Sequence, residues 1–156
     1  MKKFDPSLYF ITDSTNYSEE EFLSRVEQAL RGGVTLLQLR EKDKTTRKYL
    51  DLARKVHALT KRYGVPLIID DRLDIAMAIG AEGVHLGQSD LPIDLARKIL
   101  GPDKIIGATA KTVPQALEAY QQGADYLGVG AHHKGEDRPD LHRHPPGYLR
   151  RRPQSR

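Results

Sequence analysis

The sequence predicts an α/β fold: a parallel sheet built from repeated βα units, forming a barrel that is incomplete after about six units. Three observations support this prediction. Short apolar runs without polar alternation indicate strands that are covered on both faces, as in parallel sheets. Amphipathic stretches, with apolar residues three and four positions apart, separate the runs and indicate helices. These stretches end at a glycine, a residue that suits a left-handed helix end: Gly32, Gly64, Gly80, Gly101 and Gly123.

The first two strands are expected at residues 8–12 and 34–39. The helix between them begins with Ser18 and Glu21, which fit a capping box. The helix after the second strand has one apolar face, formed by residues at helical spacing: Tyr49, Leu52, Ala53, Val56 and Leu59. His57 lies outside this set, and we expect it on the helix surface.

Four further strands are expected at residues 66–69, 83–86, 105–108 and 126–129. A short helix beginning near Leu73 follows the third strand. A helix beginning at Leu91 and Pro92 follows the fourth, because proline suits a first helical turn. Thr112 and Gln115 fit a second capping box after the fifth strand. The order of strand, helix and glycine therefore repeats along the chain.

Two arrangements fit this order, an open sheet and a barrel. An open sheet that binds a dinucleotide would carry a G-x-G-x-x-G motif after the first strand, where this chain reads TDSTNYSEE. Polar residues instead follow successive strands, and in a barrel all these strand ends share one face. We therefore predict a barrel of the TIM type. A closed barrel usually needs at least about 200 residues, whereas the six strands here occupy the first 131.

The charge divides the chain in two. The 156 residues contain 25 Lys and Arg and 21 Asp and Glu, a net charge of +4. Residues 1–131 are neutral overall, and the whole excess lies in residues 132–156 together with four of the six histidines. We interpret 1–131 as an incomplete barrel domain and 132–156 as a basic tail rich in Pro, His and Arg, either disordered or frameshifted. Its charge predicts non-specific attraction to phosphate at most, so no specific nucleic-acid partner is expected.

The composition also excludes several protein classes. The absence of cysteine excludes disulfides and thiolate chemistry. The N-terminal sequence has Asp5 and Pro6 where a signal peptide would have an apolar segment. No apolar run approaches the roughly 18 residues that span a bilayer. We therefore expect a cytoplasmic protein without a membrane partner.

Polar side chains follow the second strand. Alternation along the strand puts Gln38, Arg40 and Lys42 on one side. An amide and two cations that point into the mouth of a barrel suit a phosphate or diphosphate ligand. The alternative is a strand end that passes into a solvated charged loop with mutual salt bridges.

Carboxylates follow the third and fourth strands. Alternation should point Asp70 and Asp71 in opposite directions, so we expect them to do different jobs, one of them binding Mg²⁺. Asp90 is a candidate second metal ligand. The alternatives are that Asp71 caps the helix near Leu73 and that Asp90 caps the helix at Leu91.

Three further residues are candidates near these strand ends. The Thr109 hydroxyl, after the fifth strand, is placed to donate to a substrate, with Lys111 as a nearby counter-charge. The alternative is a turn residue and a surface lysine. His85 either lies where backbone approaches a ligand or packs behind the site.

Six motifs, in this order, resemble the thiamine-phosphate synthase family: YFITD, LLQLREK, IIDDRLDIA, GAEGVHLGQSDLP, IIGATA and GADYLGVGA. The resemblance covers nearly all of residues 8–131. It implies a (βα)8 barrel and a Mg²⁺-dependent transferase of thiamine biosynthesis. The implied reaction joins hydroxymethylpyrimidine diphosphate to thiazole phosphate and releases diphosphate, with no side chain acting as a nucleophile.

The resemblance also assigns site residues. Asp71 and Asp90 match Mg²⁺ ligands. Asp70 stands where the family usually has Asn and Thr109 where Ser is usual, and both would contact substrate. The pyrimidine diphosphate would be bound by a continuous run: Gln38, Leu39, Arg40, Glu41 and Lys42.

The resemblance stops after Ala131. The family continues with a loop and two βα units that hold the thiazole phosphate, so we expect this chain to be truncated. Two alternative functions stay open. One is a thiazole-tautomerase-like relative, although those relatives place His where this chain has Lys111. The other is a non-catalytic barrel fragment that buries its open edges in a homo-oligomer.

Overall fold

The computed structural model of the chain describes residues 4–130. The predicted tail at 132–156 and the predicted domain end at residue 131 lie outside the described residues. Within that range a single parallel sheet runs in chain order. Its strands are β1 (Tyr9–Ile11), β2 (Leu36–Leu39), β3 (Leu67–Asp70), β4 (Gly83–Leu86), β5 (Ile105–Ala110) and β6 (Tyr126–Val129).

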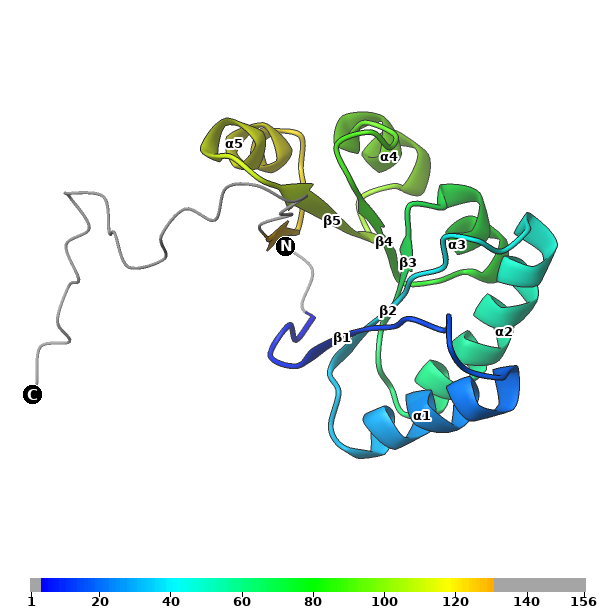
Figure 1. Ribbon diagram of the computed structural model, residues 1–156. Helices are drawn as coiled ribbons and strands as arrows, with labels where there is room; N and C mark the ends of the chain where they lie inside the picture. Colours follow the sequence, from blue (N-terminus) through cyan, green and yellow to red (C-terminus); the bar gives the residue numbers. More distant parts are fainter. Residues whose placement is uncertain (1–3, 131–156) are drawn as a thin grey trace, which may run out of the picture.

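Helices alternate with these strands. They are α1 (Glu19–Arg31), α2 (Thr46–Arg62), α3 (Leu73–Ile79), α4 (Ile93–Leu100) and α5 (Val113–Gln121). All of these lie on the outer, convex face of the curled sheet, and the concave face opens away from them (Figure 1). The described part of the chain is therefore a curled half-barrel, which confirms the predicted fold class.

The helix starts follow the predicted capping signals in part. Ser18 Oγ accepts a hydrogen bond from the Glu21 N–H at 3.2 Å, and the Glu21 carboxylate accepts one from the Ser18 N–H at 3.1 Å, so the first capping box is complete. Thr112 Oγ1 accepts from the Gln115 N–H at 3.3 Å. The Gln115 side chain, however, accepts from the Lys111 N–H at 2.8 Å, so the second predicted box is only half formed.

The helix ends correct one prediction about glycine. Gly32, at the end of α1, has a φ of −74°, and the following Gly33 has the positive φ of 101°. The other predicted helix-ending glycines do have positive φ: Gly64, Gly80, Gly101 and Gly123. The first helix therefore turns one residue later than predicted.

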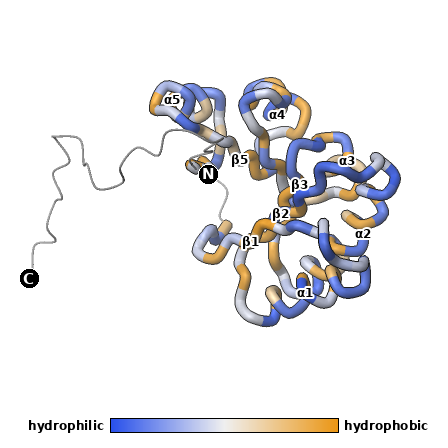
Figure 2. Tube along the Cα trace, viewed as in Figure 1, coloured by the Kyte–Doolittle hydropathy of each residue, from blue (hydrophilic) through white to orange (hydrophobic). Residues whose placement is uncertain are grey.

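The core has two layers, because strand alternation sends successive side chains to opposite faces of the sheet. The outer layer joins the sheet to the helices and contains residues such as Leu37 and Ile69 from strands and Leu52 from α2. The inner layer is small and fills the concave side with Leu36, Ile68 and Ile105. Figure 2 shows the apolar residues gathered along the strands and the hydrophilic residues on the outer helices.

His57 is buried, which corrects the prediction that it lies on the helix surface. His57 belongs to helix α2, and its Nε2 atom lies 3.1 Å from Glu82 Oε1. Glu82 Oε2 accepts the Leu67 N–H at 2.8 Å. Helix α2 packs against α1 and α3 as well as the sheet, so its buried surface is wider than the apolar stripe that the sequence displays.

The two edge strands meet across the concave side. The hydroxyl oxygens of Tyr9 in β1 and Tyr126 in β6 lie 2.6 Å apart, although 117 positions separate them in the sequence. Ile11 and Val129, on the same two strands, are exposed, as expected for a barrel with open edges. Within residues 4–130, no helix is both long and apolar enough to cross a membrane.

Candidate functional site

A cavity of about 870 Å³ opens on the concave side at the carboxyl ends of the strands. Residues from all the described strands contribute to its lining. His85 and Lys111 are among them. So are seven predicted site residues: Gln38, Arg40, Lys42, Asp70, Asp71, Asp90 and Thr109. The fold thus brings together residues that lie far apart in the sequence, as expected for barrel strand ends.

Leu39 and Glu41 do not line this cavity, because strand alternation turns their side chains to the opposite face. Leu39 is buried in the outer core layer. Glu41 Oε2 accepts a hydrogen bond from Ser14 Oγ at 2.8 Å and lies 3.4 Å from Lys44 Nζ. Both side chains therefore pack behind the strand end, away from the cavity.

Lys42 is held by both neighbouring carboxylates. Its ammonium nitrogen lies 2.7 Å from Asp70 Oδ2 and donates a hydrogen bond to Asp71 Oδ2. The prediction that the two carboxylates point in opposite directions is therefore wrong. Asp71 has a φ of +53°, outside the extended region, and this backbone turn brings its side chain round to the same side as Asp70.

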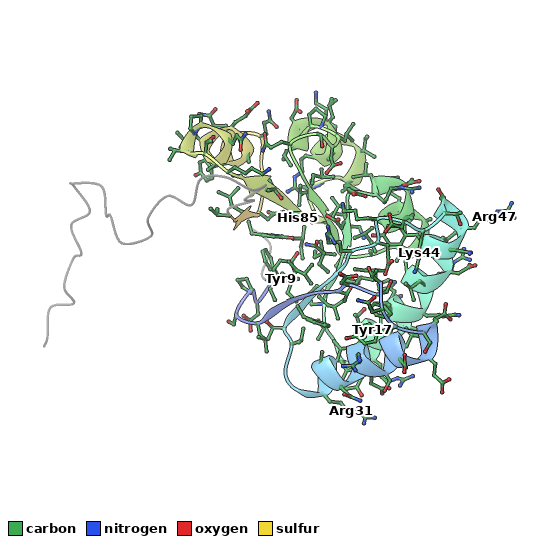
Figure 3. The ribbon with its side chains drawn as sticks, viewed as in Figure 1. Tyr9, Tyr17, Arg31, Lys44, Arg47 and His85 are labelled. Carbon is green, nitrogen blue, oxygen red and sulfur yellow. The ribbon has the colours of Figure 1, made fainter. Side chains whose placement is uncertain are left out.

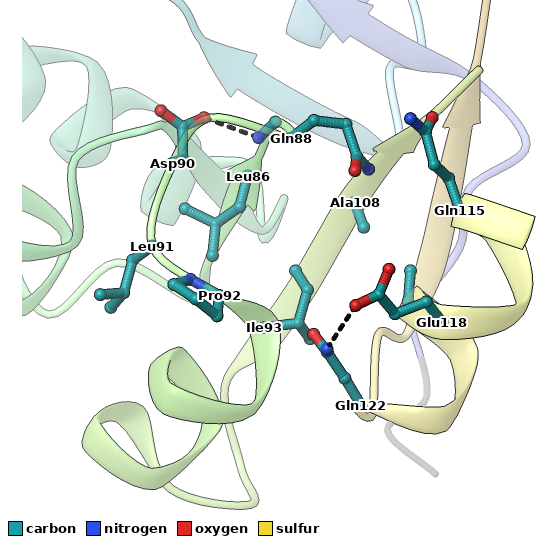
Figure 4. A pocket seen from close by; sticks show the side chains of 12 residues that line it. Leu86, Gln88, Asp90, Leu91, Pro92, Ile93, Ala108, Gln115, Glu118 and Gln122 are labelled. Carbon is teal, nitrogen blue, oxygen red and sulfur yellow. Dashed lines mark hydrogen bonds between the residues drawn. The ribbon is translucent and has the colours of Figure 1, made fainter. Parts of the chain in front are cut away.

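Helix capping does not account for the two candidate metal ligands. Helix α3 begins after Arg72, whose position carries no side-chain cap, so Asp71 does not cap it. Helix α4 begins after Pro92, also without a side-chain cap. Asp90 Oδ2 instead accepts the Gly87 N–H at 2.6 Å and closes the turn after β4 (Figure 4). The capping alternatives for both aspartates are therefore wrong.

A smaller hollow of about 140 Å³ lies between α4 and α5, behind Asp90 (Figure 4). Its lining is mixed, with apolar Leu86, Pro92 and Ile93 on one side. Glu118, on the other side, accepts a hydrogen bond from Gln122 Nε2 at 3.2 Å. This hollow holds no paired cations, so the larger cavity is the better candidate for an anionic ligand.

Three basic and three acidic side chains line the large cavity, so their formal charges cancel. Arg40 Nε lies 4.0 Å from Asp70 Oδ2, farther than the Lys42 ammonium. Burial alone would lower the pKa of Lys42, but its close contacts with the Asp70 and Asp71 carboxylates and their negative charges outweigh burial and raise that pKa. Lys42 is therefore positively charged at neutral pH, and the two carboxylates hold its ammonium group in the cavity.

The carboxylates fit a hard divalent cation such as Mg²⁺. Asp70, Asp71 and Asp90 border the same cavity, and Asp70 Oδ2 is buried without a well-directed hydrogen bond. Among residues 4–130, no three His, Asp or Glu side chains come together as a complete metal site. Mg²⁺ usually takes only one or two protein carboxylates, together with water and substrate phosphates. The carboxylates that line the cavity are therefore donors of the kind that Mg²⁺ prefers.

The floor of the cavity is a continuous chain of hydrogen-bonded side chains. Gln38 Nε2 donates to Tyr9 Oη at 2.6 Å, and Tyr9 Oη lies 2.6 Å from Tyr126 Oη. His85 Nδ1 lies 3.0 Å from Tyr126 Oη, and His85 Nε2 lies 2.8 Å from Thr109 Oγ1. Burial raises the pKa of both tyrosines and lowers that of His85, so all three side chains are neutral at pH 7. Figure 3 shows Tyr9 and His85 on the concave side.

Sequence reasoning gave no role to Tyr9 or Tyr126, although both line the cavity. The signal for Tyr9 lies in the sheet register, because Ile11 pairs with Gln38 and Tyr9 points to the same face as Ile11. The signal for Tyr126 is its pairing with Gly107, which has no side chain to exclude the ring. Both signals need the strand pairing, which the sequence alone does not supply.

Comparison with known proteins gives consistent matches. A family model described as thiamine monophosphate synthase matches residues 8–152. Thiamine-phosphate synthase 2 of Streptococcus pneumoniae is 56% identical over 124 residues, which are 80% of this chain and 59% of that protein. Thiamine-phosphate synthase of Caldanaerobacter subterraneus is 50% identical over 131 residues, or 84% of this chain and 61% of that protein.

A solved structure agrees with the sequence matches. The chain resembles the thiamine phosphate pyrophosphorylase from Pyrococcus furiosus with a TM-score of 0.73 and 42% sequence identity. That alignment covers 80% of this chain and 59% of that structure. The chain thus spans about three fifths of the length of the curated relatives that it matches.

Proposed function

The chain belongs to the thiamine monophosphate synthase family, and on this basis we propose that it joins hydroxymethylpyrimidine diphosphate to thiazole phosphate, giving thiamine phosphate and diphosphate. The observation that carries the proposal is the large cavity itself. It combines an amide, Gln38, with two cations, Arg40 and Lys42, and with carboxylates that suit Mg²⁺. This set matches a ligand that is a polar ring at one end and a diphosphate at the other.

The proposed mechanism needs the chain to bind, orient and stabilise, without a nucleophilic side chain. Arg40 and Lys42 hold the diphosphate of the pyrimidine substrate, and the ammonium of Lys42 passes from Asp70 and Asp71 to phosphate oxygens. Gln38 orients the pyrimidine ring. The bond from the pyrimidine methylene carbon to the diphosphate oxygen breaks, the electron pair leaves with diphosphate, and the thiazole nitrogen forms the new bond to that carbon. The fixed cations stabilise the charge that develops on the leaving group.

Asp71 and Asp90 would hold the metal, with Asp70 beside them. When bound, Mg²⁺ would neutralise charge on the diphosphate as a Lewis acid. Thr109 is proposed to donate its hydroxyl to a substrate oxygen, and Lys111 adds a positive charge on the same side of the cavity. Leu39 and Glu41 would contribute through backbone groups alone.

The remaining expectations are proposals of the same kind. We propose small-molecule substrates as the partners, a cytoplasmic location, and a division of the chain into a barrel domain to residue 131 and a tail at 132–156. Exposed Ile11 and Val129 on the two edge strands support association of the chain into a homo-oligomer.

An assay on the full chain tests the proposal. The chain is incubated with both substrates and Mg²⁺, and thiamine phosphate is measured by mass spectrometry. We expect product, and Lys42→Gln should lower the turnover by about 10²–10³-fold because one fixed cation is lost from the leaving group. Lys55→Gln is the matched control, because Lys55 pairs with Glu19 on the outer helices. Absence of product from the wild-type chain, or equal losses in the two variants, would overturn the proposal.

A further inference from the structure

The chain of hydrogen bonds on the cavity floor joins two residues that are proposed to touch substrate. It starts at Gln38 in β2, passes through Tyr9 in β1, Tyr126 in β6 and His85 in β4, and ends at Thr109 in β5. Its four contacts are between 2.6 and 3.0 Å long. Within this chain the three middle side chains have no hydrogen left to donate, so only the two ends, Gln38 and Thr109, can donate one to a ligand.

The direction of every bond in this chain follows from its first donor. The Gln38 Nε2 group is only a donor, so Tyr9 Oη accepts. The Tyr9 hydrogen then goes to Tyr126 Oη, and the Tyr126 hydrogen goes to His85 Nδ1. A neutral imidazole that accepts at Nδ1 carries its hydrogen on Nε2. His85 Nε2 therefore donates to Thr109 Oγ1, and the Thr109 hydrogen is free to point into the cavity.

We propose that Tyr9, Tyr126 and His85 are positioning residues that form a one-way hydrogen-bond relay. The relay presents the Thr109 hydroxyl to the cavity as a donor and Gln38 Oε1 as an acceptor. The opposite direction would also satisfy the three middle groups, but it would turn the Gln38 amide over and commit the Thr109 hydrogen to His85. The relay thus decides which end of the floor donates to a ligand and which end accepts.

Two glycines make room for the relay. A Cβ atom on Gly107 would lie 2.0 Å from Tyr126 Cζ and 2.3 Å from its hydroxyl oxygen. A Cβ atom on Gly128 would lie 3.2 Å from His85 Cε1. The Tyr126 ring also packs edge-on against the Tyr9 ring, with centroids 5.5 Å apart. The positions of the relay residues therefore depend on the missing side chains of these two glycines and on packing between the tyrosine rings.

The ligand polarity in this inference rests on the proposed function, but the relay can be tested without substrate. The full chain is labelled with ¹⁵N-histidine, and the ring nitrogens are observed by long-range ¹H–¹⁵N correlation at neutral pH. His85 is identified from the signals that disappear in His85→Gln or, where that variant unfolds, from cross-relaxation with the Tyr126 ring. We expect His85 Nε2 in the protonated range and Nδ1 in the unprotonated range.

Single hydroxyl deletions test the order of the relay. Tyr126→Phe removes the donor to His85 Nδ1, so the two nitrogen shifts of His85 should move toward each other as both tautomers become populated. Tyr9→Phe leaves the Tyr126 hydroxyl in place but removes the Tyr9 hydrogen that fixes its direction, so the two nitrogen shifts of His85 should move in the same sense. Tyr63→Phe is the control, because the Tyr63 hydroxyl bonds Glu27 and Arg31 away from the cavity.

Three results would overturn the relay. They are a protonated Nδ1 in the wild-type chain, an even mixture of tautomers there, and a His85 spectrum that Tyr126→Phe leaves unchanged. A chain that makes no thiamine phosphate but shows the expected tautomer would sink the proposed function and keep the relay. A chain that makes thiamine phosphate but shows the opposite tautomer would overturn the relay and keep the proposed function.

Discussion

Replacing Gly107 with alanine should displace the Tyr126 ring from the floor of the cavity. The new Cβ atom would lie 2.0 Å from Tyr126 Cζ, whereas non-bonded carbon atoms rest about 3.5–4.0 Å apart. The ring must therefore move by roughly 1.5 Å or more, or the backbone must strain. A shift of that size would break the contacts of Tyr126 with Tyr9, now at 2.6 Å, and with His85, now at 3.0 Å.

Both ways of relieving the clash lead to a similar loss of stability. Strain in a packed interior costs about 1–3 kcal/mol. Loss of two hydrogen bonds costs about 0.5–1.5 kcal/mol each. We therefore expect Gly107→Ala to lower the free energy of unfolding by about 1–3 kcal/mol, which corresponds to roughly 3–9 °C in Tm for a chain of this size.

Thermal and urea unfolding of the full chain, followed by circular dichroism, measures this loss. Gly32→Ala is the matched control, because Gly32 has a negative φ and its added Cβ would lie 3.4 Å from its nearest neighbours. The cause is tested in a Tyr126→Ala background, where Gly107→Ala should cost almost nothing. Equal losses in the two backgrounds, or a Gly107→Ala variant as stable as the wild type, would refute the reasoning.

Three further predictions address the site and its support. Burial lowers the pKa of His85, so the stability that the neutral side chain contributes is complete above about pH 6.5 and is lost as the pH falls. Below about pH 6.5, the midpoint of urea unfolding should therefore fall more in the wild type than in His85→Gln. Parallel pH curves for the two proteins would contradict this. Asp90→Ala should raise the Mg²⁺ concentration for half-maximal activity, whereas exposed Asp94→Ala should not, and identical Mg²⁺ titrations would argue against a metal at Asp90. Glu82→Ala leaves the Leu67 N–H without its acceptor and should destabilise the chain by about 1–3 kcal/mol in urea unfolding, while an unchanged midpoint would show that this bond does not matter.

The fold and one wall of the site could be predicted because both depend on local patterns. Apolar runs, amphipathic stretches and glycines recur along the chain and indicate βα units without reference to distant residues. The placement of Gln38, Arg40 and Lys42 in one cavity follows the alternation of strand β2, which the side chains continue for a few residues beyond its end at Leu39. The same rule separates Leu39 and Glu41 from that cavity, although the family resemblance grouped all five residues together.

The parts that could not be predicted depend on single backbone angles or on distant contacts. Asp71 faces Lys42 because of one positive φ at the end of β3, and no periodic pattern reveals such a turn. His57 is buried by the packing of α2 with its neighbouring helices. Tyr9 and Tyr126 meet only because the sheet curls, so their contact is invisible until the strands are paired.

The central claim is that the large cavity is a diphosphate site. The most direct test is to measure the binding of hydroxymethylpyrimidine diphosphate to the full chain. Titration calorimetry in Mg²⁺ should give saturable binding with one ligand per chain. Arg40→Gln should weaken it by about tenfold or more, equivalent to about 1.4 kcal/mol. Arg47→Gln, on the exposed outer surface of α2 (Figure 3), should leave it unchanged. Absence of binding, or equal affinity in wild type and Arg40→Gln, would contradict the account.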